Sequence, residues 1–304
     1  MVILSVILVI VAGLCMAFQS PTNATLTTYV GNFQASTISF GGGTLVLLLA
    51  VLIAGTGDLS LIVNAQWWQV IGGSYGAYMI LIITYGAPIL GIALTLTFIM
   101  FGQVVMGIII DFFGWFGTEA VSISGLRVLG CVIVGIGIIA VYVGKKPLNG
   151  SSKTMNSALM GLLAFVGGVF SAMQSPTNAS LAAIIGKLEA SFVSFSVGFL
   201  LLLIVTLITY KGKLKPVRGV GIRPWMVTGG LYGACTVFFN VIATPYIGVA
   251  LVVAGGMLGQ LGGGIIVDCT GVLRAPKIAM NGWRYAGVIA IAIGVVLVTI
   301  ARIG

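Results

Sequence analysis

The stretch Gln19-Ser20-Pro21-Thr22-Asn23-Ala24-Thr25-Leu26 decides the fold of this chain, because it is written twice. It returns as Gln174-Ser175-Pro176-Thr177-Asn178-Ala179-Ser180-Leu181, in which seven of the eight residues are identical at an offset of 155. Such agreement indicates a duplicated unit. Further residues keep step downstream, with the offset rising to 157 after a two-residue insertion: Gly31 with Gly186, Ser39-Phe40 with Ser194-Phe195, Trp68 with Trp225, Gly102-Gln103 with Gly259-Gln260, Asp111 with Asp268, and Arg127 with Arg284.

The composition places this duplicated unit in a membrane. Of the 304 residues, 59% are apolar and 6% are charged, whereas about a quarter of the residues in soluble domains are charged. The apolar runs are continuous rather than alternating, so they predict helices and not barrel strands, and the expected fold is all-α. A spanning helix needs about 20 apolar residues, and the sequence offers ten such runs, over residues 3–28, 34–54, 68–85, 89–110, 122–143, 157–183, 189–209, 225–243, 246–267 and 283–301.

An odd number of spans in each unit fixes how the two units are related. With five spans, the second unit must enter the membrane from the opposite side, so the halves are inverted repeats, as is typical of secondary transporters. The sequence predicts a first five-helix repeat over 1–144 and a second over 157–304. A polar cytoplasmic linker over 145–156 is expected to join them.

Lysine and arginine set the expected orientation. The loops at 144–156, 210–224 and 268–282 share one side and carry ten of these cations, whereas the other side carries three. Cytoplasmic loops are enriched in Lys and Arg. We therefore expect a multi-pass protein of the plasma (inner) membrane with both termini outside.

The residue counts also limit the chemistry. The chain has no histidine and five carboxylates, which argues against a metal site, a cofactor and enzymatic acid–base catalysis. The net charge of +9 reflects the bias of membrane loops and not nucleic-acid binding. The expected partners are the lipid bilayer and a small-molecule substrate, with protons as a candidate coupling ion.

Two features resemble a known family, the YdcZ-like branch of the drug/metabolite transporter superfamily in its fused two-domain form. They are the repeated Q-S-P-T-N-A-x-L motif and the run from Gly102-Gln103 through Asp111 to Gly117. The resemblance covers nearly the whole chain, although the second half departs from the pattern after Asp268, where it reads Cys269-Thr270-Gly271. The resemblance implies an inner-membrane carrier that exports small molecules.

The two motifs are the strongest candidates for a substrate site. Pro21 and Pro176 each remove a helical donor and are expected to break their helices inside the membrane. Polar residues beside such breaks, at corresponding positions of two halves, point to a transport site. The alternative is that their amides hydrogen-bond between helices as packing contacts. The predicted substrate-binding residues of the motifs are Gln19, Ser20, Thr22, Asn23, Gln174, Ser175, Thr177 and Asn178.

A second pair of candidate binding residues lies elsewhere in the spans. Gln103 and Gln260 each follow a glycine inside an apolar run. An amide both donates and accepts, so either residue could bind a polar substrate. Equally, each could make a helix–helix hydrogen bond beside a glycine contact.

Charged residues near the span ends are expected to pair. Asp111 and Asp268 each precede an arginine, Arg127 or Arg284, by sixteen residues. Because a charge near the bilayer is costly, a structural salt bridge is expected in each half, with a gate as the functional alternative.

Glu189 is an acid without a matching acid, since its counterpart in the first half is Gln34. It begins a predicted span, and a helix N-terminus accommodates a negative charge well. Proton coupling through Glu189 is the alternative interpretation.

Glycines are dense in four clusters. None carries the Gly-Lys-Ser/Thr ending of a phosphate loop, so these clusters predict close helix packing. They are Gly41–Gly43, Gly72–Gly73, Gly255–Gly256 and Gly262–Gly264.

The expected function is therefore export of a small metabolite by alternating access between the two repeats. The candidate residues offer amides, hydroxyls and aromatics but few charges, which favours a neutral or amphiphilic molecule. One alternative is an exporter of organic cations like the small multidrug resistance proteins, and its weakness is that the first and sixth spans contain no acid. Two others are a passive channel and a structural membrane protein without a substrate path.

Overall fold

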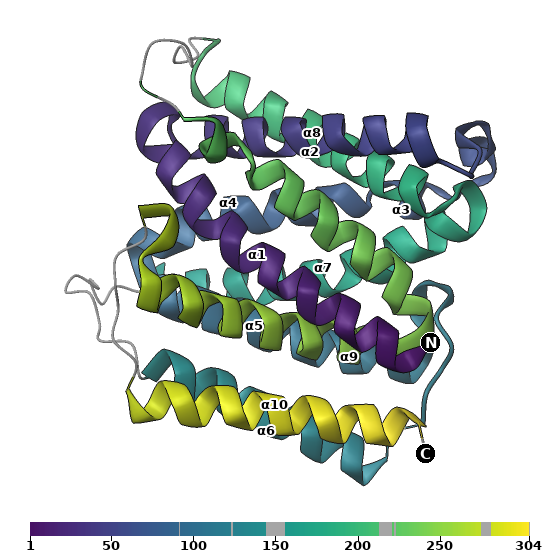
Figure 1. Cartoon of the computed structure of the whole chain (residues 1–304), viewed down its shortest axis with the longest axis vertical. Coiled ribbons are helices and arrows are strands. Elements are labelled where there is room, and N and C mark those ends of the chain that lie inside the picture. Colours follow the sequence, from purple (N-terminus) through teal and green to yellow (C-terminus); the bar gives the residue numbers. More distant parts are fainter. Residues whose placement is uncertain are drawn as a thin grey trace.

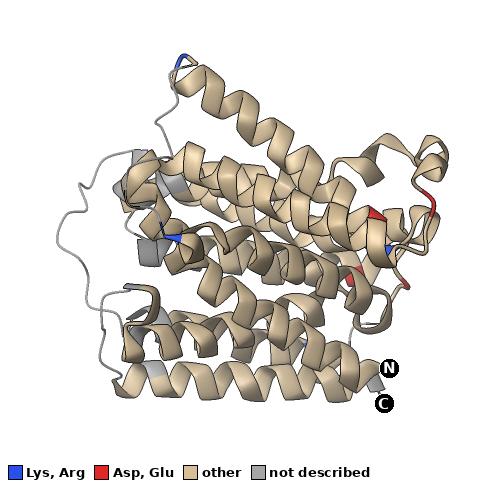
Figure 2. Cartoon of the chain, turned by 45° about the horizontal axis from the view of Figure 1, so that its top comes forward, with Lys and Arg blue, Asp and Glu red and all other residues tan. Residues whose placement is uncertain are grey.

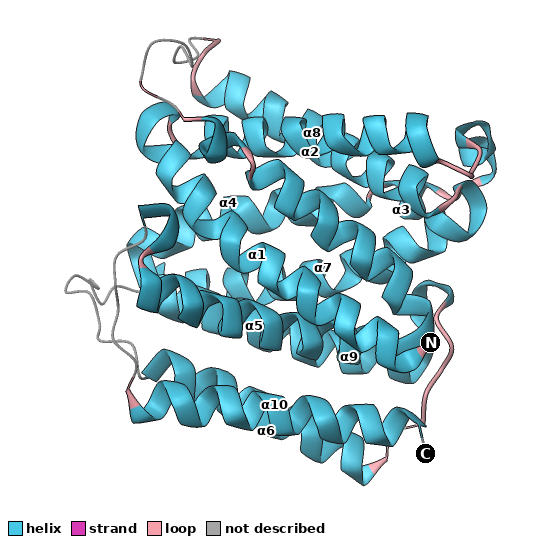
Figure 3. Ribbon diagram, viewed as in Figure 1, coloured by secondary structure: helices cyan, strands magenta, loops and turns pink. Residues whose placement is uncertain are grey.

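The computed structural model describes residues 1–90, 92–122, 124–143, 156–212, 221, 223–274 and 281–303, and these residues form helices, turns and loops without any strand (Figures 1 and 3). The expected all-α fold is confirmed. The long helices are α1 (Val2–Val30), α2 (Asn32–Ala54), α4 (Gly72–Leu90), α5 (Ile92–Phe113), α6 (Gly125–Val143), α7 (Asn156–Ile185), α8 (Lys187–Thr209), α9 (Gly229–Thr270) and α10 (Gly282–Ile303). Short helices between them are η1 (Leu59–Asn64), α3 (Trp67–Val70), η2 (Trp115–Gly117), η3 (Pro224–Val227) and η4 (Val272–Arg274).

Helix α9 supplies two membrane passes because it turns back on itself. Its 42 residues would reach about 63 Å as one straight helix, about twice the thickness of a bilayer core. Gly248 divides it, with φ 73° and ψ 171°, a backbone conformation that glycine adopts without steric cost. The described helices therefore make ten passes, as the sequence predicts.

The apolar character of these passes agrees with a membrane setting. Five described helices are long and apolar enough to cross a bilayer, namely Val2–Val30, Asn32–Ala54, Ala158–Ile185, Lys187–Thr209 and the folded-back Pro224–Val267. Shorter apolar stretches lie in the other four, at Gly72–Ile83, Phe98–Phe113, Gly125–Ala140 and Tyr285–Ala301.

Consecutive helices run in opposite directions, so both termini lie at one end of the molecule (Figure 1). We call this end, which also carries η1, η2 and the start of α8, the terminus face. Asp58, Asp111, Glu119 and Glu189 all belong to its elements, and Figure 2 shows the acidic residues gathered toward the termini. The predicted linker at 145–156 lies outside the described residues, apart from the first residue of α7.

Most helix packing crosses between the two halves. Helix α1 packs chiefly on α9. Its counterpart α7 packs in the same way on α4 and α5, which together correspond to α9 in the repeat. Helix α2 packs on its own counterpart α8, and α6 pairs with α10 at one edge of the molecule (Figure 1). Each half therefore completes its packing only against the other.

Glycines allow the closest of these crossings. A Cβ added at Gly259 of α9 would lie 1.9 Å from the Ile10 carbonyl oxygen of α1. The counterpart contact is Gly102 of α5 against α7, where an added Cβ would lie 2.1 Å from the Phe165 carbonyl oxygen, and Gly168 of α7 meets the Ile99 carbonyl oxygen of α5 at the same crossing. The predicted glycine clusters behave in two ways: a Cβ at Gly73 would lie 1.8 Å from the Ser194 carbonyl oxygen of α8, whereas a Cβ at Gly262 would have no neighbouring atom within 4 Å. The prediction of close packing is thus right for some glycines and wrong for others.

Candidate substrate site

The motif helices are not broken at their prolines, contrary to the sequence-based expectation. Helix α1 continues through Pro21, and helix α7 continues through Pro176. A proline inside a membrane helix is tolerated where nearby hydroxyls compensate for the disturbed backbone bonds. In α1, the Ser20 hydroxyl donates to the Met16 carbonyl at 3.1 Å, and the Thr22 hydroxyl donates to the Phe18 carbonyl at 2.8 Å.

The motif glutamines reach across to the opposite half. A Cβ at Gly233 of α9 would lie 2.8 Å from Nε2 of Gln19. In the symmetric contact, a Cβ at Gly76 of α4 would lie 3.2 Å from Nε2 of Gln174. A glycine without a side chain therefore makes room for each amide.

A pair of stacked phenylalanines lies between these two glutamines. Phe40 of α2 and Phe195 of α8 are counterparts in the repeat, and their ring centroids are 5.0 Å apart. A residue stacks on its own counterpart only at the axis that relates the halves, so this pair marks the pseudo-two-fold axis. A Cβ at Gly233 would also approach Phe195, and one at Gly76 would approach Phe40. The aromatic pair with its two amides is thus the symmetric centre of the molecule.

The motif asparagines contact the first residue of a helix in the other half. Oδ1 of Asn23 would lie 2.1 Å from a Cβ at Gly229, the start of α9. Oδ1 of Asn178 would lie 1.9 Å from a Cβ at Gly72, the start of α4. The first N–H groups of a helix have no partner within it, so each asparagine oxygen lies in the polar surroundings of a helix N-terminus.

Buried polar atoms without a hydrogen-bond partner gather around these asparagines. In the first half they are Oδ1 of Asn23 and Oγ of Ser39, and in the second half their counterparts Oδ1 of Asn178 and Oγ of Ser194. Both serines and Asn178 are at most 2% exposed. Unpaired buried polar groups cost about 1–3 kcal/mol each, so such a symmetric set calls for an outside partner. Thr177 Oγ1 and Asn240 Oδ1 are also buried without a hydrogen-bond partner.

The two motifs do not meet at one place. Asn23 lies seven residues beyond the middle of α1, and Asn178 lies between seven and eight beyond the middle of α7. At 1.5 Å per residue, and with the helices running in opposite directions, the asparagines are separated by about 20 Å in depth. Inversion brings together only residues near mid-depth, which is where Gln19 and Gln174 lie.

The motif serines differ between the halves. Ser175 is buried, and its hydroxyl shares a 2.8 Å hydrogen bond with the Thr244 hydroxyl of α9. Its counterpart Ser20 is exposed and bonds only to its own helix. Of the eight predicted motif residues, Ser20 is therefore the one that faces away from the helix interface.

Gln103 makes a helix–helix contact. Its Nε2 donates to the Ser171 hydroxyl of α7 at 2.8 Å, directly beside the glycine crossing of α5 and α7. The counterpart of Ser171 in the first half is Met16, which has no hydroxyl to offer Gln260. The Gln103 geometry matches the packing alternative.

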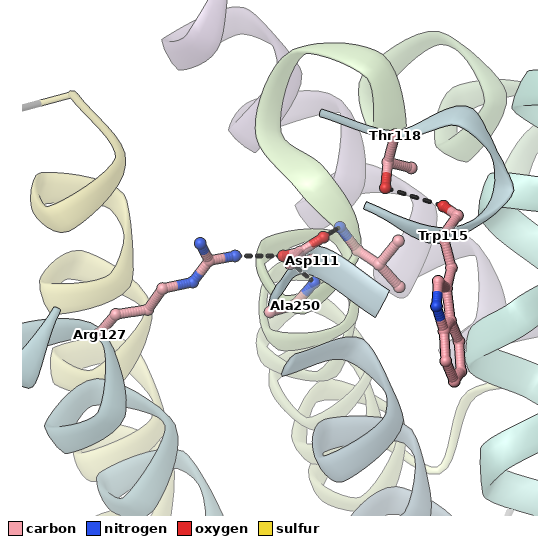
Figure 4. A network of polar contacts seen from close by, with 6 residues as sticks. Asp111, Trp115, Thr118, Arg127 and Ala250 are labelled. Atoms are coloured by element: carbon pink, nitrogen blue, oxygen red, sulfur yellow. Dashed lines mark hydrogen bonds and ion pairs between the residues drawn. The ribbon is translucent and has the colours of Figure 1, made fainter. Parts of the chain in front are cut away.

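Asp111 joins three elements at the terminus face (Figure 4). Its carboxylate forms an ion pair with Arg127 of α6 and accepts from the backbone N–H of Val249 at 2.6 Å and of Ala250 at 3.0 Å. These two amides begin the second segment of α9, so the aspartate caps a helix of the opposite half. Asp111 and Arg127 are 1% and 5% exposed. The side chains of Asp268 and Arg284 lie outside the described part of the chain.

An aromatic recess of about 330 Å³ lies between α4, α7 and α8. Tyr75 stacks on Phe170 with centroids 5.7 Å apart, and Tyr78 meets the same ring edge-on. The recess is apolar and reaches the outer surface at Leu201, which is 39% exposed. Lipid tails fill such a recess as well as a substrate does, so it does not define a site.

The sequence-based candidates omit the two serines beside the asparagines, Ser39 and Ser194, and the two phenylalanines of the centre, Phe40 and Phe195. All four are visible in the repeat, since Ser39-Phe40 recurs as Ser194-Phe195. The signal that could have found them is a polar–aromatic pair kept at both positions of an apolar span.

Residues 4–140 and 159–297 match the family described as "Putative inner membrane exporter, YdcZ". A comparison with curated proteins finds no match. A solved structure titled "Crystal structure of protein" is similar over 97% of this chain and 96% of that chain, with a TM-score of 0.71 at 16% identity. At that identity the likeness shows the fold alone.

Proposed function

Since the chain belongs to the YdcZ family of inner-membrane exporters, we propose that it exports a small neutral or amphiphilic molecule by alternating access between its two inverted halves. Supporting this class of cargo, the symmetric centre offers the amides of Gln19 and Gln174 and the rings of Phe40 and Phe195. A mixed apolar and amide lining binds such molecules and fixes their orientation.

The observation that carries the proposal is the symmetric set of unpartnered acceptors, Asn23 with Ser39 and Asn178 with Ser194. A molecule with hydroxyl or N–H groups satisfies these atoms as it passes, and water satisfies them when the site is empty. The motifs then act in sequence, one asparagine on each side of the central glutamines, and the two sides open in turn.

The cation exporter is the second candidate. Such a carrier needs an acid that a cation can reach. The acids whose side chains the structure describes, Asp58, Asp111, Glu119 and Glu189, lie at the terminus face, about half the length of a helix from the central glutamines. This arrangement favours the neutral cargo.

Replacing Asn23 or Asn178 with alanine is expected to weaken substrate affinity by about 5- to 150-fold, the equivalent of one buried polar contact. The ligand is first identified in a thermal-shift screen of detergent-purified protein that includes neutral, amine and guanidinium compounds. Because the asparagines lie far apart, the free-energy effects of the two replacements should add in the double variant.

Ser20→Ala is the matched control, because Ser20 belongs to the same motif but is exposed. It should leave the affinity unchanged. Normal affinity in both asparagine variants, together with a lower melting temperature, would show that the motif only packs helices.

We also propose the orientation and the division of the chain. Both termini lie outside, and the repeats 1–144 and 157–304 are joined by a cytoplasmic linker at 145–156. In a cysteine-free background, Ser60→Cys in η1 should react with an impermeant maleimide added to intact cells, while Lys211→Cys at the end of α8 should react only after lysis. The reverse pattern would invert the orientation.

A further inference from the structure

Glu189 is a buried acid that the transport route described above does not use. It lies in the first turn of α8 and is 2% exposed. Its Oε1 accepts a 2.9 Å hydrogen bond from the backbone N–H of Gly57. A Cβ added at Gly55, Gly57 or Gly186 would lie between 2.2 and 2.7 Å from its carboxylate. Three glycines thus form a close-fitting cage around this carboxylate.

The cage joins the two halves at the terminus face. Gly55 and Gly57 belong to the loop after α2 in the first half, and Gly186 is the turn between α7 and α8 in the second. The loop is also held by the Asp58 N–H, which donates to the Ile185 carbonyl at 3.0 Å. If the halves part at this face, the Glu189 carboxylate loses its donor.

The opposite end of the molecule holds the equivalent contact without an acid. There the turn residue is Gly31, a Cβ on which would meet the Tyr210 hydroxyl at 2.3 Å. The residue in the position of Glu189 is Gln34. One closing contact therefore carries a titratable carboxyl, and its symmetric counterpart carries an amide that keeps its charge state at every pH.

We propose that Glu189 is a proton-binding site whose protonation opens the terminus face. The carboxylate form accepts a charge-assisted hydrogen bond from Gly57, which is about twice as strong as a neutral one. Protonation removes that charge, so the contact is present at higher pH and weakens as the pH falls. The inference rests on the proposed alternating access, which it would couple to a proton gradient.

Few other charges can account for a pH effect here. The residues packed against the start of α8 from α7, η1 and α3 are apolar, such as Leu181, Ile62 and Val70. The nearby charged residues are Lys187 on the same helix and Asp58 on the loop, and within the described chain neither forms an ion pair with Glu189. Hydrogen bonds from Ser60 lower the pKa of Asp58, so Asp58 stays ionised at pH 5 and above.

Amide hydrogen exchange tests the proposal on the detergent-purified full chain, without any substrate. The readouts are the Gly57 and Asp58 amides, corrected for the intrinsic pH dependence of exchange. Between about pH 7 and about pH 3, a range in which carboxyl groups take up a proton, their protection in the wild type should fall by roughly tenfold, the effect of losing one charge-assisted hydrogen bond. Glu189→Gln should show the lower protection at every pH.

Asp58→Asn is the control and should keep the wild-type pH dependence. Amides in the middle of α2 report general unfolding. If these α2 amides also lose protection in Glu189→Gln, the variant is partly unfolded, and the pH dependence of protection in the wild type alone tests the proposal. A wild-type profile that is flat with pH, or a pH dependence that survives in a folded Glu189→Gln variant, would overturn the proposal. Since no transport is measured, either result leaves the proposed export function standing.

Discussion

Replacing Asp111 with alanine should lower the free energy of unfolding by about 3–5 kcal/mol, the usual loss when one partner of a buried ion pair is removed. Three groups lose their acceptor at once: the Arg127 guanidinium and the N–H groups of Val249 and Ala250. Arg127 is 5% exposed, so its charge has no route to water. Thermal unfolding of the detergent-purified protein measures the effect.

The reciprocal variant should be milder. In Arg127→Met the aspartate still accepts from two backbone amides at a helix N-terminus, where a negative charge is stabilised. The double variant Asp111→Asn with Arg127→Met should recover most of the stability lost in Asp111→Ala, because neither charge remains and an asparagine still caps α9. Equal losses in the two single variants, or a double variant no more stable than Asp111→Ala, would contradict this account of the network.

The second large effect is expected at the crossing of α1 and α9. In Gly259→Ala the new methyl group would lie 1.9 Å from the Ile10 carbonyl oxygen, and a backbone atom cannot turn aside. The helices must separate, at a cost of about 1–3 kcal/mol or more. Gly168→Ala should behave alike, because its Cβ would meet the Ile99 carbonyl oxygen at 1.9 Å.

Gly262→Ala is the matched control for this crossing, three residues further along the same helix. No atom lies within 4 Å of its added Cβ. The variant should be unchanged or more stable by about 0.5–1 kcal/mol, since alanine is the better helix former. Similar melting temperatures for the variants at 259 and 262 would show that the helices do not touch at Gly259.

Most of the fold could be predicted from the internal repeat. An offset of 155 to 157 residues gives the number of helices per half, their inversion and the paired positions of glycines and aromatics. It does not say which half a helix packs against. Gly259 and Gly262 look equivalent in the sequence, and only the crossing with α1 makes one of them indispensable.

The site was harder to predict for the same reason. Asn23 and Asn178 are counterparts, but whether counterparts meet depends on their depth relative to the inversion axis, which the motif itself does not encode. The capping of α9 by Asp111 depends on the turn at Gly248 in the other half. The breaks expected at Pro21 and Pro176 are absent because a proline disturbs only a few backbone bonds of a long helix. In α1 the hydroxyls of Ser20 and Thr22 also bond to carbonyls of the preceding turn.

Exchange across a reconstituted membrane tests the central claim most directly. Proteoliposomes are loaded with the compound that stabilises the protein most in the thermal-shift screen, and uptake of the same labelled compound is followed from outside. A carrier with alternating access should show saturable uptake that is accelerated by the internal compound, and the Asn23→Ala and Asn178→Ala variants should require higher concentrations. Uptake that rises linearly without saturation, or that never exceeds the uptake of empty liposomes, would contradict the account.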